Sequence, residues 1–377
     1  MPNASSTRTE PGSPEAIPAA DWNARNRGAN PFSDHRFLAA LDQAGCVGTA
    51  LGWSGGALSA GSDAYAPAWL KTHSHGEFVF DQVWAHAAHS AGLAWYPKLL
   101  VAIPLTPVTG PRLLADSAAG KAELITRLEQ LVQDRGLSCC GVNFCDQDDA
   151  EALSRAGWLA RSDWQFHWFN RGWADFEAFL ADLSTKPRKN IRRERRLAHA
   201  DGWRYRFVDG RSIRPEEIEL VERCYRTTFM QYGNLPLLNR NFFERCARSF
   251  GEQFLVCIAS QDDEDLACSV FWKNQRRLYG RYWGALVETR DVHFEACYYQ
   301  GIEYCIEHGL EAFEPGAQGE HKIRRGFVPV PTRSFHYIAH PGLREGIRRW
   351  LEAETSALQQ YRCELETMIP YRSEITR

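Results

Sequence analysis

The sequence predicts an α/β protein built from two similar lobes. Its 377 residues are enough for two domains of roughly 100–200 residues each. Hydrophobic residues make up 44% of the chain and charged residues 24%, proportions that indicate a folded protein and exclude a fibrous or wholly disordered one. In each half, amphipathic helices alternate with short apolar strands, which is the element order of α/β architecture.

The first lobe is expected over residues 21–170. Residues 1–20 are rich in Pro, Ser, Ala and Thr, so we expect a disordered lead there. Apolar spacing predicts helices over 33–44, 82–90, 121–135 and 147–156. Strand-like patterns cover 64–80, 98–109, 138–145 and 159–169, and the prolines within 98–109 favour an edge strand.

The second lobe is expected over residues 171–377. Its predicted helices cover 176–200 with an interruption near Pro187, then 216–232, 242–250, 294–307 and 343–365. Its predicted strands cover 254–259, 266–273, 277–284, 312–315 and 333–338. The two halves are not alike in sequence, so the inference of a repeat rests on element order alone.

Charge and composition exclude several classes of protein. The net charge of −3 means that a nucleic-acid partner would need a local basic patch. No apolar run approaches the length of a membrane helix, and the N-terminus lacks the apolar core of a signal peptide. Eleven scattered cysteines without a C-x-x-C pair indicate reduced thiols, so we expect a cytoplasmic protein. P-loop, dinucleotide-binding and nucleophile-elbow motifs are absent from the sequence.

The strongest charge feature is the basic run KPRKNIRRERR at 186–196, in which seven basic residues accompany one acid. On a helix, four of the basic residues share one face: Lys189, Arg192, Arg193 and Arg196. Like charges at this spacing repel one another and destabilise the helix. An anionic partner bound to this face would offset that repulsion. Phosphate on a small ligand or on RNA is the expected partner, and a solvated helix face is the alternative.

A second feature is the segment FEPGAQGEHKIRRGF at 313–327. It places ionisable residues of both signs among three glycines, directly after a predicted strand. Glycine lets a backbone approach a ligand closely, and neighbouring charges shift one another's pKa values. The segment is therefore either a functional loop, with Glu314 and His321 as candidate catalytic groups, or a plain polar surface loop.

A third feature is the segment KTHSHGEFVFD at 71–81. If it continues a strand, Lys71, His73 and His75 point to one side and Glu77 follows a glycine. A metal site is conceivable, but nothing in the sequence supplies a further ligand, so no metal is expected. We assign His73 and Glu77 to substrate binding instead.

Taken together, the chain resembles a known family after about residue 17. The motifs that carry the resemblance are KTHSHGEFVFD, YPKLLVAIPLTPVTGPRLL, QFHWFN, KNIRRERR, HFEACYYQGIEYCIEHG and FEPGAQGEHKIRRGF. They are similar to those of the FemAB-like proteins of peptidoglycan biosynthesis, which are often labelled GNAT-family N-acetyltransferases. The resemblance implies two tandem GNAT-like lobes, each a mixed sheet flanked by helices.

The resemblance implies transfer of an acyl group to an amine. Fem-type enzymes use aminoacyl-tRNA and a cell-wall precursor amine, whereas GNAT enzymes use acetyl-CoA. This chain lacks a clean GNAT pyrophosphate loop, [QR]-x-x-G-x-[GA], and also lacks the long helical hairpin of some Fem enzymes. The donor is therefore left open between aminoacyl-tRNA and acyl-CoA, and no other cofactor is expected.

The expected reaction is N-acyl transfer in a cleft between the lobes. Glu314 or His321 would act as the base. The phosphate clamps would be Lys322, Arg325 and the basic run, through which tRNA could bind. Acceptor contacts are assigned to Tyr282, Trp283 and Tyr299. The acceptor would be a small-molecule or peptide amine, and the oligomeric state is left open.

A second hypothesis is a recognition protein of the same fold that binds a wall precursor or another anionic ligand without catalysis. A fold does not fix a function, and a missing donor loop is what a retired enzyme would display.

Overall fold

Two units share the chain, and neither is one continuous segment. The structure is a computed structural model that describes residues 10–317 and 319–372. The first unit consists of Met1–Asp163 and Pro331–Gln359, and the second of Trp164–Val330 and Gln360–Arg377. The chain therefore returns to the first unit after it has built most of the second.

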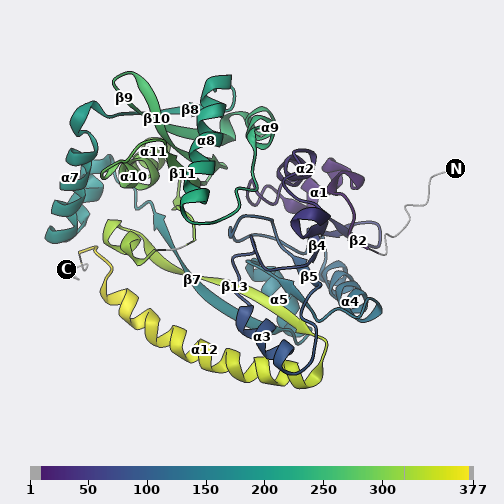
Figure 1. Ribbon diagram of the computed structural model, residues 1–377. Coiled ribbons are helices and arrows are strands. Elements are labelled where there is room, and N and C mark those ends of the chain that lie inside the picture. The colour runs from purple at the N-terminus through teal and green to yellow at the C-terminus, as the bar shows by residue number, and fades with distance from the viewer. Residues whose placement is uncertain (1–9, 318, 373–377) are drawn as a thin grey trace. The chain divides into compact units, whose positions relative to one another are not determined.

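The first unit holds a mixed sheet with helices on both faces (Figure 1). Its helices are α1 (Ala19–Asn26), α2 (His35–Gln43), α3 (Gln82–Ser90), α4 (Ala118–Asp134) and α5 (Gln147–Arg155), with 3-10 turns at Pro14–Ala16 and Thr49–Leu51. Its strands are β1 (Trp53–Gly55), β2 (Leu58–Ala60), β3 (Ala64–Ala66), β4 (Ala68–Lys71), β5 (Lys98–Val101) and β6 (Cys139–Val142). In the sheet, β4 lies antiparallel to both β1 and β5, and β5 runs parallel to β6, while β2 and β3 form a separate hairpin.

Alternating side chains of the first unit's sheet face two cores. On one face, Cys140 packs with Leu124, Leu128 and Leu153, which come from α4 and α5. On the other face, Cys139 packs with Trp84 and Trp95, together with residues of the long helix α12 (Pro341–Thr367). The period of two along β6 explains why adjacent cysteines enter different cores.

The second unit begins within β7 (Leu159–Phe169). It continues through α6 (Phe176–Asp182), α7 (Thr185–Ala198), a 3-10 turn at Ala200–Gly202, β8 (Arg204–Asp209), α8 (Pro215–Gln231), α9 (Arg240–Phe250) and a 3-10 turn at Gly251–Gln253. There follow β9 (Phe254–Gln261), β10 (Glu264–Lys273), β11 (Arg277–Ala285), the helical segment α10 (Val292–Phe294), a π-helical turn at Glu295–Tyr299 and α11 (Gln300–Glu307). The last elements are β12 (Ala312–Glu314), a 3-10 helix at Glu320–Arg325 and β13 (Val328–Ile338).

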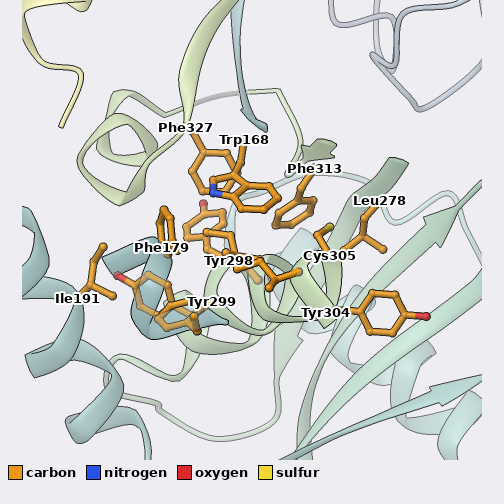
Figure 2. Close-up of a cluster of buried hydrophobic side chains, with 14 of the residues drawn as sticks. Trp168, Phe179, Ile191, Leu278, Tyr298, Tyr299, Tyr304, Cys305, Phe313 and Phe327 are labelled. Carbon is orange, nitrogen blue, oxygen red and sulfur yellow. The ribbon is translucent and has the colours of Figure 1, made fainter. Parts of the chain in front are cut away.

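The second unit's sheet follows the same plan as the first. Strands β8, β9, β10 and β11 are successively antiparallel, β11 runs parallel to β12, and β12 lies antiparallel to β7. The main core gathers aromatic side chains beneath α6, α7 and α11; Trp168, Phe179, Tyr298, Tyr299 and Phe313 are among those drawn in Figure 2. Each unit thus contains antiparallel strands, a parallel strand–helix–strand crossover and a closing antiparallel strand. This confirms the predicted α/β class.

The closing strands are exchanged between the units. β7 follows the first unit's helix α5, yet its Trp168 and Phe169 pair with β12 of the second unit. β13 follows the second unit's elements, yet its residues Phe335–Ile338 pair with β6 of the first unit. The expected division at residue 170 therefore needs correction: residues 331–359 belong to the first unit, because β13 completes that unit's sheet.

Three smaller expectations also differ from the structure. Residues 1–9 lie outside the described residues, but Gly12 pairs with Ala57 and α1 begins at Ala19, so the expected disordered lead does not extend to residue 20. β5 ends at Val101, before the prolines, and is an interior strand. The helix expected over 176–200 is interrupted at Leu183, whose backbone is extended, and not at Pro187. Pro187 lies in the first turn of α7, where its missing backbone N–H is not needed for an intrahelical hydrogen bond.

Candidate functional site

A buried arginine organises the polar centre of the second unit. Arg325 donates to both carboxylate oxygens of Glu194, at 3.1 and 2.9 Å, and to the Tyr299 hydroxyl at 3.0 Å. The same hydroxyl donates to Glu194, and the guanidinium lies 3.6 Å from the Phe294 ring centroid. Figure 2 shows Tyr299 beside Ile191 of α7. Arg325 was expected to clamp a phosphate; instead its donors are occupied by protein groups, so it positions neighbouring residues.

Lys322 is a buried lysine of this centre whose pKa is strongly lowered. Its side chain is buried, and Nζ donates to the carbonyl oxygen of Gly316 at 2.8 Å. Burial lowers its pKa to about 7, Cys297 opposes this shift and Arg281 adds to it. Within residues 10–317 and 319–372, no carboxylate forms an ion pair with Lys322. An ammonium held this way can lose its proton near neutral pH.

Two histidines lie under the influence of Lys322. His321 is exposed, and its Nε2 lies 3.0 Å from the Tyr298 hydroxyl. Burial of its ring, with Arg325 and Lys322 nearby, lowers the pKa of His321. His167 is buried, and its pKa is lowered by burial against the opposing effect of Glu314, with Arg277 and Lys322 contributing to the decrease. Both rings are therefore favoured in the neutral form at pH 7.

Glu314 lies at the end of β12 with different partners from His321. One carboxylate oxygen accepts from Arg277 at 2.9 Å, and the other lies 3.9 Å from His167 Nε2. That second oxygen is buried and forms no hydrogen bond among the described residues. Glu314 and His321 thus belong to two sides of the Lys322 environment rather than to one contacting pair.

In the part of the chain that the structure describes, β12 pairs with only the first three residues of β11. The two strands pair only over Arg277–Tyr279 and Ala312–Glu314, while β11 continues to Ala285. One extra residue in β11, Arg281, forms a bulge opposite the junction of Val270 and Phe271. The π-helical turn lies in the crossover between these strands, and such turns occur often at functional sites.

The predicted acceptor aromatics are distributed over both faces of the sheet. Tyr282 is buried, and its ring centroid lies 5.2 Å from that of Tyr225 on α8, so it is a core residue. Trp283 is half-buried and lies 5.4 Å from the His293 ring. Tyr299 is buried and bonded to Glu194. Of the three, Trp283 has the most exposed side chain.

A separate polar cluster occupies the first unit. Lys98, at the start of β5, donates to Glu77 at 2.7 Å and also to Asp81. All three side chains are buried. The strand expected over 64–80 ends at Lys71, so His73 and Glu77 are not on one face: His73 is half-buried beside the exposed His75, whereas Glu77 points inward to Lys98.

The model of the FemAB-like family, described as peptidoglycan biosynthesis/recognition, matches residues 13–373. The chain belongs to the FemAB-like family. No curated protein matches it in sequence.

The fold of this FemAB-like protein is found in solved structures, including the following two. One is FemX, with a TM-score of 0.54 at 11% identity, covering 88% of this chain and 98% of that one. The other is the C-terminal domain of a putative lysylphosphatidylglycerol synthetase from Agrobacterium fabrum, with a TM-score of 0.55 at 7% identity, covering 87% and 94%. At these identities the likeness establishes the fold alone.

The basic run of this FemAB-like protein forms α7, whose faces differ. Lys189, Arg193 and Arg196 are exposed, and Arg192 is exposed beside Glu177. The opposite face carries Glu194 and Arg195 into the unit. The four predicted phosphate-binding residues therefore do share an exposed face, as the spacing implied.

Sequence reasoning missed the inward residues of α7. Arg195 forms ion pairs with Glu295 at 2.9 Å and with Glu303 at 2.7 Å. Burial would raise the pKa of Glu295, but His199 and Arg195 hold it below its ordinary value. One signal was available: Glu194 is the single acid within the basic run, and a lone opposite charge often marks the inward face.

Proposed function

We propose that this FemAB-like protein is an N-acyltransferase whose second unit carries the chemistry. The observation that supports it most is Lys322, a buried lysine without a carboxylate partner among the described residues and with a pKa of about 7. Such a lysine can both accept and return a proton near neutral pH. It lies in the 3-10 helix that follows β12, and the charge of Arg281 on β11 contributes to its lowered pKa.

The reaction is attack of an amine nitrogen on the carbonyl carbon of an acyl ester or thioester. The C–N bond forms and the carbonyl oxygen becomes an oxyanion. Neutral Lys322 takes the proton that the nitrogen releases, and the resulting ammonium stabilises the oxyanion. When the C–O or C–S bond breaks, the same proton passes to the leaving oxygen or sulfur, and Lys322 returns to its neutral form.

The other residues position Lys322 or share its proton. Arg325, held by Glu194 and Tyr299, fixes the 3-10 helix that carries Lys322, so it acts as a positioning residue. His321 is a neutral group on the exposed side and is the candidate that delivers or removes the proton from solvent. Glu314 has one unbonded oxygen and remains the candidate base for an acceptor ammonium.

Aminoacyl-tRNA is the donor that the exposed face of α7 favours. Lys189, Arg193 and Arg196 offer charges at helical spacing to a phosphate backbone. Acyl-CoA is the alternative donor, with fewer phosphates to meet. The acceptor is a small-molecule or peptide amine of peptidoglycan synthesis, and either donor places the reaction in the cytoplasm. Within residues 10–317 and 319–372, no helix has the length and apolar character to cross a membrane.

Transfer assays with the full chain test the proposal. Purified protein is supplied with radiolabelled aminoacyl-tRNA or acyl-CoA and with candidate amines. Lys322→Met should lower turnover by a factor of about 10²–10⁴, the usual contribution of a general acid–base group. Arg324→Met is the matched control, because Arg324 is exposed in the same 3-10 helix and should retain activity.

Two outcomes contradict the proposal. Full activity in Lys322→Met would remove the lysine from the chemistry. Saturable binding of donor or wall precursor without any turnover would instead favour the recognition protein that the fold also allows.

A further inference from the structure

A small cavity lies at the polar cluster of the first unit. It has a volume of about 10 Å³, which is room for a single water-sized group. Its wall contains Glu77, Asp81, Lys98, Asn143 and His336, together with apolar residues. The elements that supply them are the segment before α3, the start of β5, the end of β6 and β13, so the cavity lies within one unit.

Three of the side chains that line the cavity carry unsatisfied polar atoms. Glu77 Oε1, both amide atoms of Asn143 and His336 Nε2 are buried and form no hydrogen bond within residues 10–317 and 319–372. All three side chains are at least nine-tenths buried. Buried polar atoms normally find partners, so three such side chains around one void indicate an occupant. Gly141 belongs to the same wall, since a Cβ at that position would lie 3.5 Å from both Asn143 Oδ1 and His336 Nδ1.

The charges around the cavity select the occupant. Lys98 already satisfies one oxygen of Glu77 and one of Asp81. The other facing ionisable groups are Lys71, the Cys139 thiol and His336, and Arg161 acts on His336. Burial lowers the pKa of His336 to about 3 and that of Lys71 to about 7, and burial raises the pKa of Cys139 to about 12. Among the residues that line the cavity, two carboxylates, Glu77 and Asp81, face one fixed cation, Lys98.

We propose that this cavity binds the primary ammonium group of an alkylamine, with Glu77 Oε1, Asn143 Oδ1 and His336 Nε2 accepting its three N–H donors. An ammonium head has the size of one water and supplies the missing charge. An anion would meet the unpaired Glu77 oxygen, and a quaternary ammonium is too large and lacks donors.

A second void next to the cavity would hold the alkyl chain of the amine. This void of about 30 Å³ shares Val79 with the first. Its wall combines the aromatic residues Phe78, Phe80 and Phe144 with the polar residues Arg161, Ser162, Asp163, Thr332 and Ser334. Phe78 and Phe80 are partly exposed, so this void lies near the protein surface. The segment Glu77–Asp81 thus alternates acids facing Lys98 with aromatic side chains on its other side. The inference does not depend on the proposed acyl transfer, because none of these residues lies in the second unit.

Binding should be linked to the proton of Glu77. Burial raises its pKa to about 7, against the opposing effect of Lys98. An incoming ammonium favours the ionised carboxylate, so binding should release a proton and strengthen as pH rises through 7. Below that value, affinity should fall roughly tenfold for each pH unit.

NMR titration of the full chain tests the site. The probe is ethylammonium chloride, followed through the Trp95 indole N–H, which donates to Asp81 at 2.7 Å and is assigned with Trp95→Phe. At pH 8 the Trp95 indole N–H resonance should shift saturably with ethylammonium concentration. Tetramethylammonium at equal ionic strength should leave that resonance unshifted. n-Butylammonium should bind more tightly, by roughly fourfold for each methylene that leaves water.

Variants separate the ammonium site from a hydrated void. Glu77→Gln keeps the shape and should weaken binding by roughly tenfold or more. Glu123→Gln, exposed on α4 of the same unit, should bind as the unmodified protein does. Equal response to tetramethylammonium, no saturable shift, or unchanged affinity in Glu77→Gln would overturn the proposal and leave a water in the cavity. If Glu77→Gln fails to fold, the pH dependence and probe selectivity of the unmodified protein decide.

Discussion

Lys98 in the first unit and Lys322 in the second are both buried, yet their surroundings give them opposite properties. Burial would lower the pKa of Lys98, but Glu77 and Asp81 raise it well above its ordinary value. Lys322 has a carbonyl oxygen and the neighbouring charge of Arg281, and its pKa falls to about 7. A buried lysine between carboxylates is a fixed structural charge, whereas one without them becomes a group that exchanges protons near neutral pH.

The largest expected effect on stability comes from removing the paired lysine. Lys98→Met leaves two buried carboxylates without their counter-ion and should cost about 3–5 kcal/mol of the free energy of unfolding. Lys322→Met removes an unpaired buried cation and should leave that free energy unchanged or raised. Denaturant unfolding of both variants measures the difference. A Lys98→Met variant as stable as Lys322→Met would show that the two lysines do not differ as described.

A companion variant isolates the charge from the packing. Lys98→Met combined with Glu77→Gln and Asp81→Asn removes all three charges and should recover part of the lost stability, because no uncompensated carboxylate remains. No recovery would indicate that the loss came from packing instead.

The second expected effect is a pair of opposite pH dependences. Lys322 has its pKa lowered from 10.5 to about 7, so the unfolded chain binds more protons between these values and its contribution to stability rises with pH from 7 to 10.5. Glu77 has its pKa raised from 4.5 to about 7, so the folded chain binds more protons there and its contribution falls as pH rises from 4.5 to 7.

Stability measured against pH should separate the two groups. Lys322→Met should reduce the rise above pH 7 and leave the fall below it, and Glu77→Gln should reduce the fall and leave the rise. Part of the rise should remain in Lys322→Met, because burial also lowers the pKa of Lys71 to about 7. A variant that reduces both limbs, or neither, would contradict these assignments.

The smallest expected effect on stability concerns the exposed charges of α7. Arg193→Glu with Arg196→Glu should change the free energy of unfolding by only about 0.5 kcal/mol per site, because both side chains are exposed. If Lys189, Arg193 and Arg196 each contact a phosphate of tRNA, the slope of log affinity against log salt should be about −2 to −3, and the double variant should lose most of it.

Arg223→Glu with Arg226→Glu on α8 is the control for that measurement, since it reverses two exposed charges at the same spacing. A flat salt slope, or an equal loss in the control, would make the α7 face an ordinary solvated surface.

Local patterns predicted most elements of the fold but not its pairing. The periodicity located α3, α5 and β7 to within a residue, because a single helix or strand face is encoded within the segment. The exchange of β7 and β13 has no local signal, since either strand would satisfy either sheet by composition. For the same reason the expected boundary at residue 170 missed the return of the chain to the first unit.

The candidate site was predicted in part for similar reasons. The 313–327 segment pointed to Lys322, His321 and Glu314 because its charges and glycines are adjacent in sequence. The pairing of Arg325 with Glu194 was not predicted, because Glu194 lies 131 residues away and only the fold brings the two together. Burial also lowers the pKa of Lys322, and the residues next to it in the sequence do not reveal how deeply its side chain is buried.

The exchanged closing strands affect how the chain folds as it is synthesised. β6 of the first unit needs Phe335–Ile338 as its antiparallel neighbour, and this segment is made after nearly the whole second unit. At roughly 5–20 residues per second, that strand leaves the ribosome about 10–40 s after β6. Until then one edge of the first unit's sheet is open to other chains, a known route to aggregation. A nascent chain arrested before residue 338 would lack the strand that closes its N-terminal sheet.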